Sequence, residues 1–245
     1  AHSYKYYGKS LRFMNQPLQF IPYSETSGKL HMDLDNSLLD RHSRDPQSPS
    51  ILRFYRWAPA AISLGFHQKK YPEHWQAIAE NHNLDIVHRP SGGRAVLHKG
   101  DLTYAVITSI DINGKKRSHR EIYEYICGFL IQGFAELGVP LTYGLAGRGY
   151  IHNPSCFSTA TNADLVIADG RKLIGSAQVY RHNSVLQHGS IAITPDFELL
   201  KELFGAEVPI VGCQELMQGD RQYCLQKLIE VLSQSARQYF RAEFF

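Results

Sequence analysis

The sequence has no apolar run approaching the ~18 to 20 residues that a membrane-spanning helix needs. Its first residues, AHSYKYYGKS, also lack the apolar core of a secretory signal peptide. We therefore expect a cytoplasmic protein with no membrane partner. Excess charge of one sign is scarce too, because the 245 residues carry a formal net charge of only +3. Nucleic acid is accordingly not expected as a partner.

Cysteine is rare, and its spacing argues against two structural uses. The four cysteines, Cys127, Cys156, Cys213 and Cys224, include no CxxC pair. Neither a metal site nor a disulfide scaffold is therefore expected. Cys127 and Cys224 lie in helical patterns and are interpreted as small core residues. Cys156 lies in the irregular polar segment NPSCFSTATNADL, where both a buried structural thiol and a reactive nucleophile remain open.

The chain contains no internal repeat and no convincing linker, so we expect a single domain over residues 1–245. Leu30, Leu34 and Leu38 form one predicted stripe of a helix over 30–42, joined by Met32 and Leu39 nearby. Ser118 and Glu121 predict a capping box at the start of a helix that Gly138 closes. Strands dominate the middle of the chain, and a helical tail follows. The predicted class is α+β, with a mixed, largely antiparallel sheet backed by helices.

A hairpin is predicted around Asp169-Gly170, between two apolar-rich runs. Strict alternation along its second strand would place Lys172 with Ile174 on one face and Leu173 with Gly175 on the other. A surface lysine is the usual reading just after a turn. The small residues of GSA follow directly, however, and such residues in a strand often mark the close approach of a ligand.

The segment HRPSGGRAVLH, residues 88–98, combines a glycine pair with two flanking arginines. A tight turn between strands would explain the glycines alone. Arg89 and Arg94 offer fork-shaped cationic donors suited to carboxylate or phosphate, and His98 ends the next short strand. We therefore interpret the segment as a loop that holds an anionic or polar ligand against exposed backbone N–H groups.

Four blocks of the sequence resemble the biotin/lipoate A/B protein ligase family. They are RWAPAAISLGFHQ, HRPSGGRAVLH, RKLIGSAQVYR and LQHGSIAI, in that order, within a core of about residues 30–195 followed by a helical extension over 196–245. The resemblance implies a catalytic domain with the fold of biotin and lipoate protein ligases, which is related to class II synthetases. It also implies chemistry on octanoyl or lipoyl groups destined for a lysine of a lipoyl domain.

The family contains ATP-dependent ligases, octanoyltransferases that use a cysteine thioester, and amidotransferases. The segment SCFSTATNADLVIADGRKLIGSAQ is similar to the cysteine segment of the octanoyltransferases, which implies Cys156 as nucleophile and Lys172 as the second catalytic residue. Ala160 replaces a usual Pro and Asp164 a usual Glu. We interpret both departures as lying outside the chemistry.

The resemblance implies a further set of substrate-binding residues: Arg89, Ser91, Gly92, Gly93, Arg94, His98, Gly175, Ser176, His188 and Gly189. No cofactor would be required. The implied donor is acyl carrier protein, and the implied acceptors are lipoyl-domain proteins such as the glycine cleavage H protein and the E2 subunits of 2-oxoacid dehydrogenases.

Two alternatives stay open. A lipoate–protein ligase would use ATP and Mg²⁺, hold the adenylate phosphate with Arg89, Arg94 and Lys172, and leave Cys156 idle. A non-catalytic lipoate- or biotin-binding protein would bind its ligand and form no product.

Overall fold

A seven-stranded mixed sheet forms the centre of the protein. The computed structural model describes residues 18–144, 164–205 and 209–242. The strands lie in the order β1 (Gln19–Thr26), β2 (Ile51–Trp57), β6 (Asp101–Ser109), β12 (Ser184–Ala192), β11 (Lys172–Arg181), β10 (Asp164–Val166) and β9 (Thr142–Tyr143). Only β1 and β2 pair in parallel within the described part of this sheet. The predicted α+β class with a largely antiparallel sheet is confirmed.

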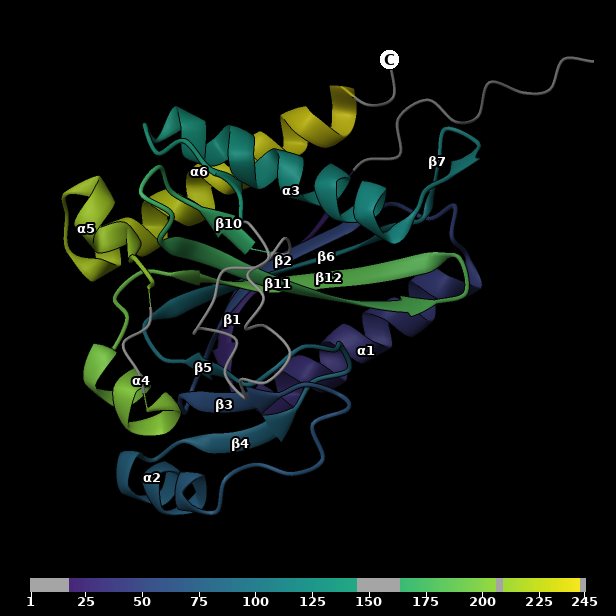
Figure 1. Cartoon of the computed structure of the whole chain (residues 1–245). Coiled ribbons are helices and arrows are strands. Elements are labelled where there is room, and N and C mark those ends of the chain that lie inside the picture. The colour runs from purple at the N-terminus through teal and green to yellow at the C-terminus, as the bar shows by residue number, and fades with distance from the viewer. Residues whose placement is uncertain (1–17, 145–163, 206–208, 243–245) are drawn as a thin grey trace, which may run out of the picture.

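Two smaller sheets flank this centre. One has the order β4 (Asp85–His88), β3 (Ala61–Leu64) and β5 (Val96–His98), and it lies beside the large sheet in Figure 1. The other is the hairpin of β7 (Asp111–Ile112) and β8 (Lys115–Lys116). The three-stranded sheet matters for function, because it brings the SGG loop, which joins β4 to β5, against the large sheet.

Helices cover both faces of the large sheet (Figure 1). On one face, α3 (His119–Glu136) and α6 (Arg221–Ala242) pack together and share the largest hydrophobic core with the strands. On the other face lies α1 (Gly28–Arg44), in a smaller core with β2, β6 and β12. The short helices are α2 (His74–His82), α4 (Phe197–Phe204) and α5 (Cys213–Met217). No helix of the described ranges is long and apolar enough to cross a membrane.

The local signals for helix and turn are confirmed. Ser118 and Glu121 form both halves of the capping box of α3, and Gly138 follows that helix with φ 75°. The turn between β10 and β11 has Gly170 at φ 87°, a conformation that favours glycine. The predicted helical tail is present as α4, α5 and α6. The capping box and the two glycines with positive φ therefore determine where α3 and the β10–β11 turn begin and end.

The predicted stripe of α1 is confirmed only in part. Leu38, Met32 and Leu39 are buried, whereas Leu30 is 58% exposed and Leu34 is 37% exposed. The buried side also carries polar residues, including the fully buried Asp35. The helix turns this side inward because its polar groups find partners on the sheet.

Candidate active site

A cavity lies between the large sheet and the three-stranded sheet, with a volume of about 620 Å³ including the space at its mouth. It is lined from β2, β3, β5, β6, β10, β11, β12 and the SGG loop. The lining residues are Tyr55, Trp57, Ser63, Arg89, Gly93, Arg94, Val96, His98, Thr103, Asp164, Lys172, Gly175, Ser176, Ala177, His188, Gly189 and Ser190. Nine of the twelve predicted site residues are among them. Segments distant in the sequence therefore meet around one space.

Lys172 enters this cavity from the first residue of β11. Its Nζ lies 2.8 Å from Oδ1 of Asp164, and the Lys172 side chain is 6% exposed. The main chain is also held, because the Lys172 N–H donates to the Pro209 carbonyl (2.8 Å) and the Lys172 carbonyl accepts from the Val211 N–H (2.9 Å). A buried ammonium on a fixed backbone is suited to stabilising negative charge that develops in the cavity.

A β-bulge changes the predicted alternation along β11. The pairing with β10 shifts register between Lys172 and Ile174, so that Leu173 and Ile174 both pack into the core. Gly175 consequently lies on the same side as Lys172, where a methyl group at position 175 would stand 2.6 Å from Lys172 Cε. The prediction that these two residues occupy opposite faces is wrong. Gly175 leaves room for the lysine side chain.

Ser176 and Gly189 lie side by side on neighbouring strands at the back of the cavity. Ser176 Oγ is hydrogen-bonded to Tyr104 Oη at 2.7 Å. A methyl group at position 189 would stand 2.6 Å from both the Gly175 carbonyl oxygen and the Tyr104 ring. A side chain at position 189 would therefore force the two strands or the tyrosine to move.

Arg89 holds the SGG loop together. Its Nη1 donates to the carbonyl and the hydroxyl of Ser63 (2.9 and 3.0 Å), and its Nη2 donates to the carbonyls of Gly92 (2.8 Å) and Arg94 (2.7 Å). The loop meets the neighbouring turn closely, since a methyl group at Gly65 would lie 1.9 Å from the Gly93 carbonyl oxygen. The Arg89 guanidinium therefore fixes the conformation of the loop through hydrogen bonds to its carbonyl groups.

A buried network joins α1 to the same loop. Asp35 accepts hydrogen bonds from Arg53 Nη1 (2.6 Å), Tyr55 Oη (2.7 Å) and His188 Nδ1 (3.2 Å). The second ring nitrogen of His188, Nε2, is hydrogen-bonded to Ser91 Oγ. Since a carboxylate only accepts, Nδ1 carries a proton, and in the neutral ring Nε2 accepts from the Ser91 hydroxyl. Ser91 and Gly92 do not line the cavity themselves.

The pKa of Asp35 shows which interactions dominate this network. Burial alone would raise it, but the hydrogen bond from His188 and the charge of Arg53 outweigh burial and lower the pKa below its ordinary value. The carboxylate is therefore ionised inside the protein and paired with the Arg53 guanidinium, whose side chain is 1% exposed.

His98 belongs to a second network of the same composition. Its Nδ1 donates to Asp101 Oδ2 (2.8 Å), and its Nε2 is hydrogen-bonded to Ser63 Oγ (2.9 Å). Its ring stacks on Trp57 with 4.0 Å between centroids. Burial lowers the pKa of His98, which favours the neutral ring despite the Asp101 charge.

The thiols of the described residues are unsuited to nucleophilic attack. Cys127, Cys213 and Cys224 are buried in the main core. Burial raises the pKa of Cys127 to about 12 and raises that of Cys213 further. The interpretation of Cys127 and Cys224 as core residues is confirmed. Cys156 lies outside the described residues.

Within the ranges 18–144, 164–205 and 209–242 there is no group of three or more His, Cys, Asp or Glu side chains that could hold a metal ion. The cavity presents small residues and aromatic rings, together with Arg89, Arg94, His98, His188 and one lysine–aspartate pair. This lining fits an uncharged acyl chain that ends in a polar carbonyl group.

The family model of the lipoyl protein ligase A/B catalytic domain matches residues 27–216. The chain belongs to this family. Octanoyltransferase LipM of Bacillus subtilis is 34% identical over 92% of this chain and 84% of its own length. Octanoyltransferase LipM of Halalkalibacterium halodurans is 36% identical over 76% of this chain and 69% of its own.

Two solved lipoate ligases share the fold. Lipoate-protein ligase A bound with ATP superposes with a TM-score of 0.67 at 19% identity, over 91% of this chain and 86% of that one. The bipartite lipoate protein ligase of Thermoplasma acidophilum gives 0.64 at 19% identity, over 91% and 84%. The predicted family and fold are thus confirmed. The region matched by the family model, residues 27–216, contains α1, the SGG loop and β11.

The sequence analysis missed several residues that line the cavity or hold its lining in place. Asp164 was interpreted as lying outside the chemistry, whereas it contacts the Lys172 ammonium. Asp35, Asp101 and Ser63 were not singled out at all. The hairpin pairing offered a signal for Asp164, since β10 must lie against β11. For Asp35, the only signal was a polar residue on a helix beside Met32 and Leu39.

Proposed function

We propose that this protein is an octanoyltransferase that moves an octanoyl group from acyl carrier protein, through a thioester on Cys156, to a lysine of a lipoyl domain. The similarity to octanoyltransferases at 34–36% identity over most of the chain carries this proposal. The geometry supports it, because Asp164, eight residues after Cys156, contacts Lys172 in the cavity between the two sheets.

In the first half-reaction, the Cys156 thiolate attacks the carbonyl carbon of the carrier-bound thioester. The Lys172 ammonium stabilises the oxyanion of the tetrahedral intermediate. The bond to the carrier sulfur then breaks, and the carrier leaves as a thiol after taking up one proton. In the second half-reaction, the neutral amine of the target lysine attacks the octanoyl-Cys156 thioester, loses one proton and forms the amide, and the cysteine sulfur is released.

The two cavity histidines position groups in this scheme. Both ring nitrogens of His98 and of His188 are engaged by an aspartate on one side and a serine on the other. Gly93 and Arg94 line the space that the thioester enters, whereas Ser91 and Gly92 belong to the same loop without lining that space. No cofactor takes part in the proposed transfer.

The decisive experiment offers the protein octanoyl-acyl carrier protein and an apo lipoyl domain, with and without ATP. Transfer without ATP is expected. Without an acceptor, an octanoyl mass should appear on Cys156 and vanish with neutral hydroxylamine. Modification that requires ATP and free octanoate, and that persists in Cys156→Ala, would instead establish a ligase.

Lys172→Ala should lower kcat by about 10²- to 10³-fold, the effect of removing one oxyanion donor. Lys172→Arg should not restore the rate, because the cavity around Gly175 is filled by the slim lysine chain. The neighbouring Arg171→Ala is the matched control, since Arg171 pairs with Asp169 and Glu215 on the surface. Normal turnover by a folded Lys172→Ala protein would remove Lys172 from the mechanism.

A further inference from the structure

Two chain segments contain no acidic residue: one lines part of the cavity, and the other is hydrogen-bonded to that segment. Residues 64–72 and 88–100 together hold five Lys or Arg and three His among 22 positions. The whole chain has 23 Asp and Glu among 245 residues, so about two would be expected here. The small net charge of the protein therefore conceals a local excess of positive charge.

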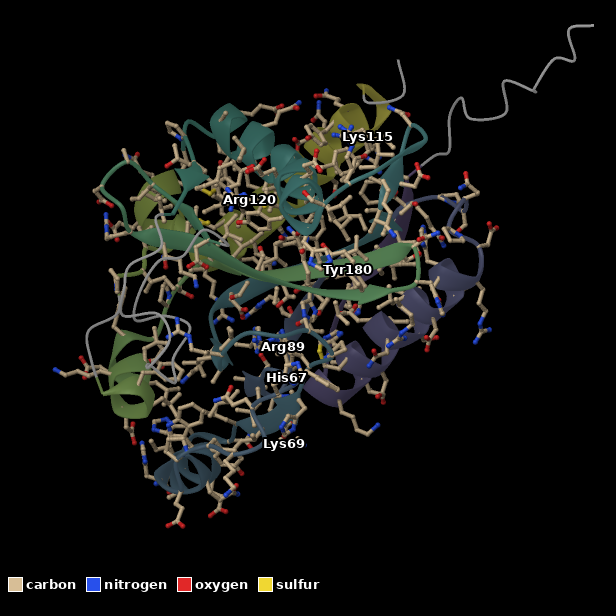
Figure 2. All side chains as sticks on the ribbon, turned by 45° about the vertical axis from the view of Figure 1, so that its right-hand side comes forward. His67, Lys69, Arg89, Lys115, Arg120 and Tyr180 are labelled. Atoms are coloured by element: carbon tan, nitrogen blue, oxygen red, sulfur yellow. The ribbon has the colours of Figure 1, made fainter. Side chains whose placement is uncertain are left out.

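The first of these segments is fastened to the SGG loop. The Phe66 N–H donates to the Ser91 carbonyl at 2.9 Å, and His88 Nε2 is hydrogen-bonded to the Gln68 carbonyl at 3.1 Å. Figure 2 shows His67 and Lys69 on the same side of the molecule as Arg89. A partner seated on residues 66–70 would therefore lie against the loop whose Gly93 and Arg94 line the cavity.

The side chains of this segment face outward. Phe66 is 61% exposed, and His67, Lys69 and Lys70 are exposed as well. In the part of the chain that the structure describes, neither Lys69 nor Lys70 forms an ion pair, whereas Lys99 is held by Asp196 at 2.9 Å. An exposed aromatic ring beside unpaired cations is typical of a surface that binds an acidic partner.

We propose that Phe66, His67, Lys69 and Lys70, together the rim patch, dock the acyl carrier protein that delivers the octanoyl thioester. This inference rests on the proposed function. A carrier of this kind is a small acidic protein whose acyl group hangs on a long arm joined through a phosphodiester. The cations of the rim patch complement both the acidic surface and the phosphodiester. The acceptor lysine carries no phosphate, so the phosphodiester distinguishes the carrier from the lipoyl domain as the partner of the rim patch.

The test reverses the charge of the rim patch in Lys69→Glu/Lys70→Glu. The matched control is Lys115→Glu/Lys116→Glu on β8, an exposed lysine pair with the same change of charge, far from Lys69 in Figure 2. KM is measured for octanoyl-acyl carrier protein and for octanoyl-pantetheine, which has no protein part. Binding of acyl carrier protein is measured separately by fluorescence anisotropy.

The rim variant should raise the KM for octanoyl-acyl carrier protein by about 10-fold and weaken carrier binding by a similar factor. Its KM for octanoyl-pantetheine should stay unchanged, as should all values of the control. Added salt should weaken carrier binding to the wild type more than to the rim variant.

Three outcomes would overturn the inference: unchanged carrier binding in the rim variant, an equal loss in the control, or a rise in the KM of the lipoyl domain alone. Carrier binding does not depend on turnover, so it tests the rim patch even where transfer fails. Absence of transfer from both donors without ATP would instead refute the proposed function.

Discussion

Two aspartate–histidine–serine networks hold the cavity, and they are built differently. Asp35–His188–Ser91 joins residues that are 153 and 97 positions apart in the sequence. In Asp101–His98–Ser63 the separations are 3 and 35 positions. The first network therefore ties α1, β12 and the SGG loop together, whereas the second orders one turn and its neighbouring strand.

The networks also differ in charge. Asp35 is paired with the buried Arg53, and its carboxylate is completely enclosed. Asp101 is satisfied by His98 and by the Ser190 hydroxyl at 2.7 Å, and among the described residues its side chain pairs with no Lys or Arg. Loss of Asp35 would strand a buried cation, and loss of Asp101 would strand only neutral donors.

The largest expected effect follows from this difference. Asp35→Ala should lower the free energy of unfolding by about 3–5 kcal/mol, the usual cost of breaking a buried ion pair. Asp101→Ala should lower it by about 1–3 kcal/mol, the cost of unsatisfied neutral groups. Urea unfolding at pH 7 measures both, and equal losses would contradict the distinction.

The double variant Asp35→Leu/Arg53→Met is the control for this comparison. It removes both charges and fills their space with apolar groups, so it should recover most of the stability lost in Asp35→Ala. No recovery would mean that the cost arises from Tyr55 and His188 and has little to do with the ion pair.

The sequence predicts local elements better than contacts between distant segments. Capping boxes, glycine turns and hairpins act over a few residues, which is why α3 and the β10–β11 turn are confirmed. The inward side of α1 depends on Arg53 and His188, which approach only after folding. The spacing of the leucines therefore predicted the burial of Leu38 correctly and that of Leu30 and Leu34 wrongly.

The site follows the same rule. Lys172, His98 and His188, which each lie in a continuous family block, line one cavity. The bulge in β11 depends on how Val166 pairs across the hairpin, and alternation along one strand carries no information about it. Gly175 was therefore assigned to the wrong side.

A double-mutant cycle should show that the two networks are independent. Asp35→Asn and Ser91→Ala both act on His188, so their effects on stability should be coupled by about 1 kcal/mol. Asp35→Asn and Ser63→Ala share no partner and should add to within about 0.5 kcal/mol. Strong coupling between Asp35→Asn and Ser63→Ala would show that the two networks act as one energetic unit.

The smallest expected effect concerns pH, where the two networks should respond in different ranges. A lowered pKa means that the unfolded chain takes up its proton first, so the stabilising contribution is lost as pH falls below the ordinary value of the group. For His98 this loss begins below 6.5, and for Asp35 it begins only below 3.8.

His98→Gln should therefore flatten the dependence of unfolding free energy on pH between about pH 5 and pH 6.5, whereas Asp35→Asn should not flatten it. The flattening should be partial, because burial also lowers the pKa of His31 and His42. Urea unfolding of the three proteins over this range provides the measurement. If Asp35→Asn flattened the curve as much as His98→Gln, protonation of His98 would depend on Asp35. The two networks would then not respond to pH independently.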